Sequence, residues 1–367
     1  MKVKLNRALL EISLNKCFDA CERKSSESLT NFNFNNDTLT LCTKGSFTFF
    51  TTIIENIDID QENIANFTLK TSAILEFVKY ISSEEIVIVY DDSKKSCLLS
   101  TSDKKSKIAF QVSNEIFEDP ESKDDHKEFK ITNLDDFINK LNYASRFCSN
   151  SIDDYPLTGI YCKLGKNTFD IKSTNGPSFY QCVIECGNDN DFEFYLQKKS
   201  STIIKNISSN EMIKTFGVNT KYFYIESERS KLKIYIDKCE KNSFPAQIDD
   251  CLTKESACTL KISSFEFLKT LKYFNGVIPN STVKLVCNNG LVTLESSQSN
   301  FAAKENLAVE SQKGSVSACY STKMLIDCLE ALPFSWVDVD FILMQDNFYI
   351  CKISNIKNIT LLCPDLS

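Results

Sequence analysis

The pattern of hydrophobic and polar positions along the chain repeats three times. Each copy opens with an amphipathic segment at helical spacing, continues with two alternating stretches around a tight turn, and closes with a second amphipathic segment. The offset between copies, roughly 125 to 130 residues, far exceeds that of a solenoid repeat, so each copy predicts a whole domain. The opening segments span 5–24, 131–147 and 262–275, the hairpins 32–42, 160–171 and 283–294, and the closing segments 70–80, 198–207 and 322–332.

Strand patterns dominate each copy. Residues 46–51 and 222–225 are rich in β-forming aromatic residues, and Asn289-Gly290 between alternating stretches predicts a hairpin. By contrast, the apolar residues of 134–147 and 265–274 form one helical face each. About two helices and many strands per copy predict an α+β fold, with helices on one side of antiparallel sheets.

Two polar stretches, 119–125 and 249–256, are interpreted as linkers between the copies. They divide the chain into predicted domains 1–126, 127–253 and 254–367, each of common domain size.

The composition is that of a globular protein, with 367 residues of which 42% are hydrophobic. No stretch reaches the ~18–20 apolar residues of a membrane span, and Met1-Lys2-Val3-Lys4 leads into a helical pattern without a secretory signal. We therefore expect a cytoplasmic protein. In that compartment the sixteen cysteines are better interpreted as reduced and buried than as disulfide-bonded.

Few residues suit catalysis or metal binding. The single histidine, His126, lies in an acidic stretch, which argues against Ser-His or Cys-His chemistry. The pairs Cys17/Cys21 and Cys182/Cys186 have no histidine partner for zinc, and no glycine-rich phosphate loop is present. We expect no catalytic residue, no metal and no cofactor.

Charge is distributed unevenly. The chain has a net charge of −7, yet the six amphipathic segments together carry +5, which leaves −12 on the remainder. A basic helical layer on an acidic body suits loose, sequence-independent contact with a polyanion, of the kind that permits sliding. The candidate phosphate contacts are Arg23, Lys24, Lys70, Lys79, Lys140, Arg146, Lys198, Lys199, Lys205, Lys269 and Lys272.

Five short segments occur in an order and spacing typical of one known family. They are Met1-Lys2-Val3, Leu157-Thr158-Gly159-Ile160, Ser173-Thr174-Asn175-Gly176, Ser243-Phe244-Pro245 and Leu361-Leu362-Cys363-Pro364. Together with the length and the three-domain layout, they resemble the bacterial sliding clamp, the β subunit of DNA polymerase III, over essentially the whole chain.

The resemblance implies a non-catalytic processivity factor. Two chains would close head to tail into a six-domain ring around double-stranded DNA near the nucleoid, with helices lining the hole and sheets outside. The ring would tether the replicative polymerase, the clamp loader and repair proteins through short peptide motifs. In the implied homodimer, Lys107, Ile108 and Phe110 would meet Tyr273 and Phe274.

The resemblance also implies a peptide-binding groove. Because Leu361–Pro364 lies near a chain end, we expect these apolar residues to form an exposed pocket wall. The groove residues carried over are Leu157, Thr174, Gly176, Pro177, Phe179, Pro245, Phe348, Leu361, Leu362, Cys363 and Pro364.

The sequence departs from the family pattern in this groove. Pro177-Ser178-Phe179 stands where the family usually has H-R-L, and Asp249-Asp250 replaces an expected arginine. Two alternatives therefore stay open: a clamp-fold interaction scaffold that no longer tracks DNA, and an enzyme with a cysteine nucleophile. The sequence also leaves open whether this is a main clamp or a mobile element's specialised copy.

Overall fold

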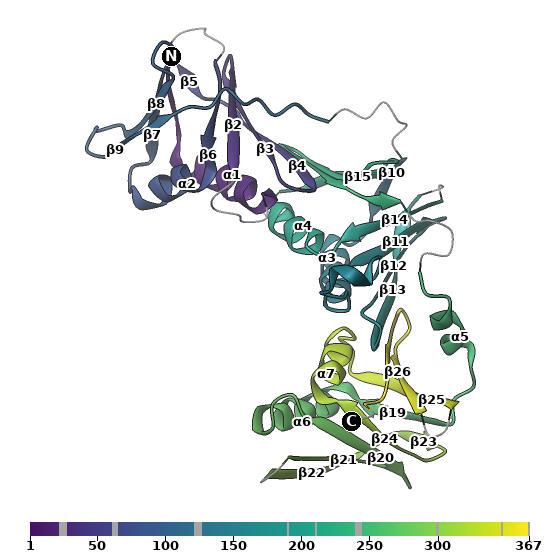
Figure 1. Ribbon diagram of the computed structural model, residues 1–367. Coiled ribbons are helices and arrows are strands. Elements are labelled where there is room, and N and C mark those ends of the chain that lie inside the picture. Colours follow the sequence, from purple (N-terminus) through teal and green to yellow (C-terminus); the bar gives the residue numbers. More distant parts are fainter. Residues whose placement is uncertain are drawn as a thin grey trace. The chain divides into compact units, whose positions relative to one another are not determined.

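The protein is described by a computed structural model (Figure 1). The structure describes residues 1–21, 28–60, 65–120, 127–188, 191–209, 211–238, 244–298, 301–345 and 348–365. His126 lies outside these residues. Helices and antiparallel strands alternate throughout, which confirms the predicted α+β fold.

A β-α-β-β-β module occurs six times along the described residues, twice in each predicted domain. The first two modules are β1 (Lys2–Asn6), α1 (Arg7–Ala20), β2 (Leu29–Asn35), β3 (Thr38–Lys44), β4 (Thr48–Ile54), and β6 (Ala65–Lys70), α2 (Thr71–Tyr80), β7 (Glu85–Asp91), β8 (Ser96–Thr101), β9 (Lys107–Gln111). The next two are β10 (Lys127–Ile131), α3 (Leu134–Arg146), β11 (Gly159–Gly165), β12 (Thr168–Thr174), β13 (Ser178–Gly187), and β14 (Phe192–Gln197), α4 (Ser200–Ser208), β15 (Ile213–Val218), β16 (Tyr222–Ser227), β17 (Ser230–Tyr235).

The last two modules complete the series. They are β19 (Cys258–Ser263), α6 (Ser264–Val277), β20 (Thr282–Asn288), β21 (Leu291–Gln298), β22 (Phe301–Ala308), and β24 (Val316–Ser321), α7 (Thr322–Glu330), β25 (Trp336–Gln345), β26 (Phe348–Ser354), β27 (Asn358–Leu362). Short additional elements are β5 (Asp58–Ile59), β18 (Asp237–Lys238), β23 (Ser311–Lys313), a 3-10 turn (Ile152–Asp154) and α5 (Gln247–Thr253).

Each predicted helix and hairpin occurs, and local chemistry explains its boundaries. The Asn6 side chain accepts a hydrogen bond from the backbone N–H of Leu9 and begins α1, and Asn133 accepts from Asp136 at the start of α3. Asn289 and Gly290, with φ values of 51° and 78°, form the tight turn between β20 and β21.

The described chain forms two compact units. The first comprises Met1–Lys130 and Lys199–Asp237, and the second comprises Ile131–Lys198 and Lys238–Ser367. These two units do not correspond to the three predicted domains, so the three-domain division stays a prediction.

Each unit contains a composite sheet that joins strands distant in sequence. In the first unit the strand order is β10-β15-β16-β17-β4-β3-β2-β6, beside the five-stranded sheet β5-β1-β7-β8-β9. In the second unit it is β14-β11-β12-β13-β27-β26-β25-β19-β23, beside the four-stranded sheet β22-β21-β20-β24. The helices bury one apolar face each, as Leu10, Leu14 and Cys17 of α1 do, and Figure 1 shows α6 and α7 side by side.

The segment interpreted as the second linker contains a helix. α5 covers Gln247–Thr253, and its Cys251 is buried. Ile248, Cys251 and Leu252 recur at helical spacing, so the sequence held a short amphipathic signal among its polar residues.

Candidate functional site

An apolar cluster gathers in the second unit where β13 meets β27. Phe179 of β13 lies directly opposite Leu361 of β27, because the two strands pair antiparallel. The buried members of the cluster are Phe179, Cys251, Ile342, Ile350 and Leu361, and the partly buried residues packed against it are Phe244, Ile248, Leu252, Met344 and Phe348. The structure thus brings together three predicted groove residues, Phe179, Phe348 and Leu361.

The turn before β13 supports this cluster from one side. The Thr174 hydroxyl donates to the Ser178 carbonyl at 2.7 Å and accepts from the Gly176 N–H at 3.1 Å. Gly176 has a φ of +92°, a conformation that L side chains rarely adopt. The Cys363 N–H donates to the Pro177 carbonyl at 2.8 Å, so the turn and the carboxyl-terminal segment lie in contact.

The carboxyl-terminal residues differ from the expectation of an exposed wall. Leu361 and Leu362 are buried, because β27 is paired on both sides with β13 and β26. Cys363 and Pro364 are half-buried. The partly exposed apolar surface comes instead from Phe244, Ile248, Leu252 and Met344, which the sequence reasoning missed. Leu157 and Pro245 are half-buried in loops, and the Pro245 carbonyl accepts a hydrogen bond from the N–H of Ile248, which packs against the cluster, at 3.2 Å.

The acidic residue in the place of the family's arginine has a partner. Lys172 lies 3.4 Å from the Asp249 carboxylate, and its ammonium lies 5.8 Å from the centroid of the Phe244 ring. This cation covers the edge of the cluster and reduces the negative potential there.

The candidate phosphate contacts have different surroundings. Lys70, Lys79, Lys199, Lys205, Lys269 and Lys272 are exposed. Lys140 is buried, 2.9 Å from Asp136, and donates to the Val183 carbonyl, so its ammonium is out of reach of a phosphate. Lys198 donates to the Asn150 side chain at 2.8 Å. Arg23 and Lys24 lie outside the described residues.

Two cations of the second unit share one carboxylate. Arg146 of α3 lies 2.7 Å from Glu330 of α7, and Lys272 of α6 lies 2.8 Å from the same side chain. Hydrogen bonds from Lys272 and Arg146 hold the pKa of Glu330 below its ordinary value, against the opposing effect of burial. Part of the basic layer in this unit is therefore neutralised.

The predicted subunit contacts also divide into two groups. β9 is an edge strand of its sheet, with Lys107 exposed and Ile108 and Phe110 half-buried. Tyr273 of α6 is exposed, whereas Phe274 is fully buried within its own unit and its side chain is out of reach of a second chain. Within the part of the chain that the structure describes, β22 also forms an unpaired sheet edge, which the sequence reasoning did not single out.

Thiol and metal chemistry find little support in the described part of the chain. No group of three or more His, Cys, Asp or Glu side chains there could hold a metal ion. Burial raises the pKa of the thiols of Cys148, Cys182 and Cys328 to about 12, which keeps them protonated at neutral pH. Among the helices that the structure describes, none has the length and apolar character to cross a membrane.

Sequence comparison alone gives no assignment, because no protein-family model and no curated protein matches the chain.

Comparison with solved structures does find close matches. A DNA polymerase sliding clamp from Bacillus subtilis superposes with a TM-score of 0.87 at 14% identity, covering 100% of this chain and 99% of that one. The DNA polymerase III beta chain from Streptococcus pneumoniae gives 0.85 at 16% identity, and the Helicobacter pylori beta clamp, solved with 3,4-difluorobenzamide, gives 0.84 at 17% identity, both covering 100% of each chain. The chain therefore has, over its whole length, the fold of bacterial DNA polymerase III beta subunits, with a sequence that has diverged far from theirs.

Proposed function

We propose that the chain is a non-catalytic DNA sliding clamp whose ring is made of two copies. The observation that carries this proposal is a rule of strand pairing between modules. The last strand of the first module, β4, pairs with β17 of the fourth, and β13 of the third pairs with β27 of the sixth. Each odd-numbered module thus pairs with the module three further along the chain.

Applied to the fifth module, this rule requires a second chain. The last strand of the fifth module is β22, and the module three further along would be the second module of another copy, which ends in β9. Both strands lie at sheet edges among the described residues, and unpaired edges recruit further strands. Pairing β22 with β9 would give a nine-stranded sheet, as many strands as the composite sheet of the second unit.

Because each chain has one β9 edge and one β22 edge, two copies would satisfy all four edges and close head to tail. Ile108 and Phe110 give β9 an apolar contact surface, and Phe274 is left out of this interface. Around the hole, the exposed cations Lys70, Lys79, Lys199, Lys205 and Lys269 would contact phosphates without reading sequence.

The apolar cluster around Phe179 and Leu361 is the proposed site for short peptides of the replicative polymerase, the clamp loader and repair proteins. Phe244, Ile248 and Leu252 offer partly exposed apolar surface that suits peptides with hydrophobic anchors. Since Lys172 engages Asp249, we expect charged contacts to contribute less there.

Analytical ultracentrifugation tests the ring directly. Wild type should sediment as a dimer, and Ile108→Asp combined with Phe110→Asp should give monomers, because two buried carboxylates in a subunit interface are costly. Ile356→Asp is the matched control, since Ile356 is 94% exposed on the turn between β26 and β27 and belongs to neither edge strand. A monomeric wild type at micromolar concentration contradicts the ring.

The neutralised cations favour a second candidate, an interaction scaffold with the clamp fold that does not track DNA. Lys140 is buried, and Arg146 and Lys272 share Glu330. Retention on circular but not linear DNA that falls steeply with salt supports the clamp. A dimer that binds polymerase-derived peptides without such retention supports the scaffold.

A further inference from the structure

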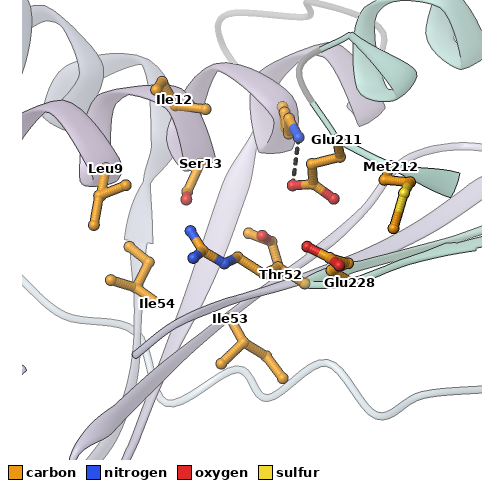
Figure 2. Close-up of a pocket in the computed structure, with 11 residues that line it drawn as sticks. Leu9, Ile12, Ser13, Thr52, Ile53, Ile54, Glu211, Met212 and Glu228 are labelled. Atoms are coloured by element: carbon orange, nitrogen blue, oxygen red, sulfur yellow. Dashed lines mark hydrogen bonds and ion pairs between the residues drawn. The ribbon is translucent and has the colours of Figure 1, made fainter. Parts of the chain in front are cut away.

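A pocket of about 350 Å³ opens in the first unit (Figure 2). It lies between α1, β4, the segment that follows α4, and the turn between β16 and β17. Its lining residues are Leu9, Ile12, Ser13, Lys16, Thr52, Ile53, Ile54, Glu211, Met212, Glu228 and Arg229.

The pocket walls are apolar and accessible. Figure 2 shows Leu9 of α1 and Ile54 of β4 facing each other across the opening. Leu9 is 38% exposed, Ile12 is 46% exposed and Met212 is 67% exposed. Apolar side chains of α1 and of the segment that follows α4 are thus left partly uncovered beside the buried Ile54, which is typical of a binding surface.

The floor of the pocket is fixed by a buried ion pair. Lys16 lies 2.5 Å from Glu211, which also accepts hydrogen bonds from Ser230, at 2.8 Å, and from Ser227. Burial alone would raise the pKa of Glu211, but the hydrogen bonds from Lys16, Ser227 and Ser230 outweigh it and lower that pKa. The charges of the floor therefore satisfy each other and leave little affinity for a ligand charge.

The rim offers a cation of a different kind. Arg229 lines the pocket, and no carboxylate among the described residues forms an ion pair with its guanidinium. The corresponding turn of the second unit, between β26 and β27, carries Lys357, which lies 2.8 Å from Glu185. The two turns are equivalent because the Ile53 N–H donates to the Arg229 carbonyl and the Val183 N–H donates to the Lys357 carbonyl.

The equivalent site of the second unit lacks the apolar walls. Asn6 and Asn133 cap α1 and α3 in the same way, which aligns Leu9 with Asp136 and Ser13 with Lys140. Asp136 and Lys140 form an ion pair at 2.9 Å, where α1 presents an apolar and a small side chain. The pocket thus results from side chains particular to the first unit and not from the shared backbone.

We propose that this pocket binds a short segment of a partner protein in which a large apolar side chain stands next to an aspartate or glutamate. The apolar side chain packs against Leu9 and Ile54, and the acidic group pairs with Arg229. Glu228 on the same turn disfavours further acidic residues. Small-molecule sites usually enclose most of their ligand, whereas these walls are open, so a peptide with flanking contacts is the better fit. The proposal does not depend on the ring or on the apolar cluster of the second unit.

Selection from a displayed library of random short peptides on the full-length protein tests this proposal. Selected peptides are then measured by fluorescence polarisation against wild type and single variants. We expect the bound sequences to share an apolar residue beside Asp or Glu. Leu9→Gln should weaken their binding about tenfold, and Arg229→Gln on the order of fivefold. Lys357→Gln, at the equivalent turn of the second unit, is the matched control and should change nothing.

A second measurement isolates the charge contact. Replacing the peptide's acid with its amide should weaken binding to wild type by the same factor as Arg229→Gln, with no further loss when both changes are combined. If Leu9→Gln perturbs folding, Leu9→Ala replaces it, because alanine favours the helix and removes the same apolar wall. Independent effects of the two charge changes overturn the proposal. So does a set of peptides that all keep their affinity for Leu9→Gln, or that lose it only with Ile248→Gln in the apolar cluster of the second unit.

Discussion

Two strand junctions of the molecule have equivalent backbones: β4 pairs with β17 in the first unit, and β13 pairs with β27 in the second. At each junction, an ion pair connects the helix of one module to the other module, but the two ion pairs differ. In the first unit, Lys16 of α1 pairs with Glu211, and the side chains are only 5% and 15% exposed. In the second unit, Arg146 of α3 pairs with Glu330 of α7, at 43% and 28% exposure. The same sheet connection thus contains a buried pair at one junction and a solvent-exposed pair at the other.

The two junctions therefore draw their stability from different interactions. A buried pair depends on complete hydrogen bonding, and Glu211 obtains it from Lys16, Ser227 and Ser230. An exposed pair is weakened by water and salt, so the second junction relies on its apolar cluster instead.

The largest effect is expected from Glu211→Gln. Removing the charge leaves the Lys16 ammonium buried without a counter-ion, which should destabilise the first unit by about 3 kcal/mol or more. The matched variant Glu330→Gln should lower the unfolding free energy of the second unit by less than about 1 kcal/mol, because the partners of Glu330 are partly exposed. Urea denaturation with hydrogen exchange at α1 and α4 measures both. Equal losses contradict the comparison.

The second prediction concerns pH. The pKa of Glu211 is lowered in the folded state, so its contribution is fully present above the unfolded value of about 4.3 and is lost as pH falls through the folded value. The difference in unfolding free energy between wild type and Glu211→Gln should therefore be largest near neutral pH and shrink below about pH 4. A difference that stays constant down to pH 2 assigns the effect to packing, not to charge.

The secondary structure of both junctions was predicted well from the sequence. The helices, the hairpins and their turns follow from apolar periodicity, asparagine caps and Asn-Gly chemistry, all of which act within a few residues. Phe179 and Leu361 were assigned to one groove through a family resemblance, and the strand register places them opposite each other.

Other features could not be predicted because they depend on contacts between distant residues. The Lys16–Glu211 pair joins positions 195 residues apart, and nothing local distinguishes Lys16 from the exposed lysines. Burial of Leu362 depends on β13 and β26 flanking the last strand, which overrides the usual exposure of a chain end. The helix α5 differs from these features, because the helical spacing of its apolar residues could have been recognised in the sequence although the surrounding residues are polar.

A smaller effect is expected in the second unit from Ile248→Ala. Ile248 of α5 packs against the apolar cluster while partly exposed, so its truncation should cost about 1 kcal/mol of the unfolding free energy. Gln247→Ala, at an exposed position of the same helix, is the control and should cost nearly nothing. Thermal denaturation followed by hydrogen exchange at β13 and β27 measures the difference. An equal response of the two variants means that α5 contributes no packing to the cluster.

The smallest effect on stability comes from making the two junctions alike. Leu9→Asp combined with Ser13→Lys places on α1 the pair that Asp136 and Lys140 form on α3. Leu9 is already 38% exposed and Ser13 lines the pocket, which leaves room for a longer side chain, so the unfolding free energy should change by less than about 1 kcal/mol. The same two substitutions remove the apolar wall that faces Ile54 and should abolish pocket-dependent peptide binding. Fluorescence polarisation and urea denaturation on the same preparation measure binding and stability. If binding is lost while stability is kept, the side chains at positions 9 and 13, and not the shared backbone, determine which junction binds the peptide.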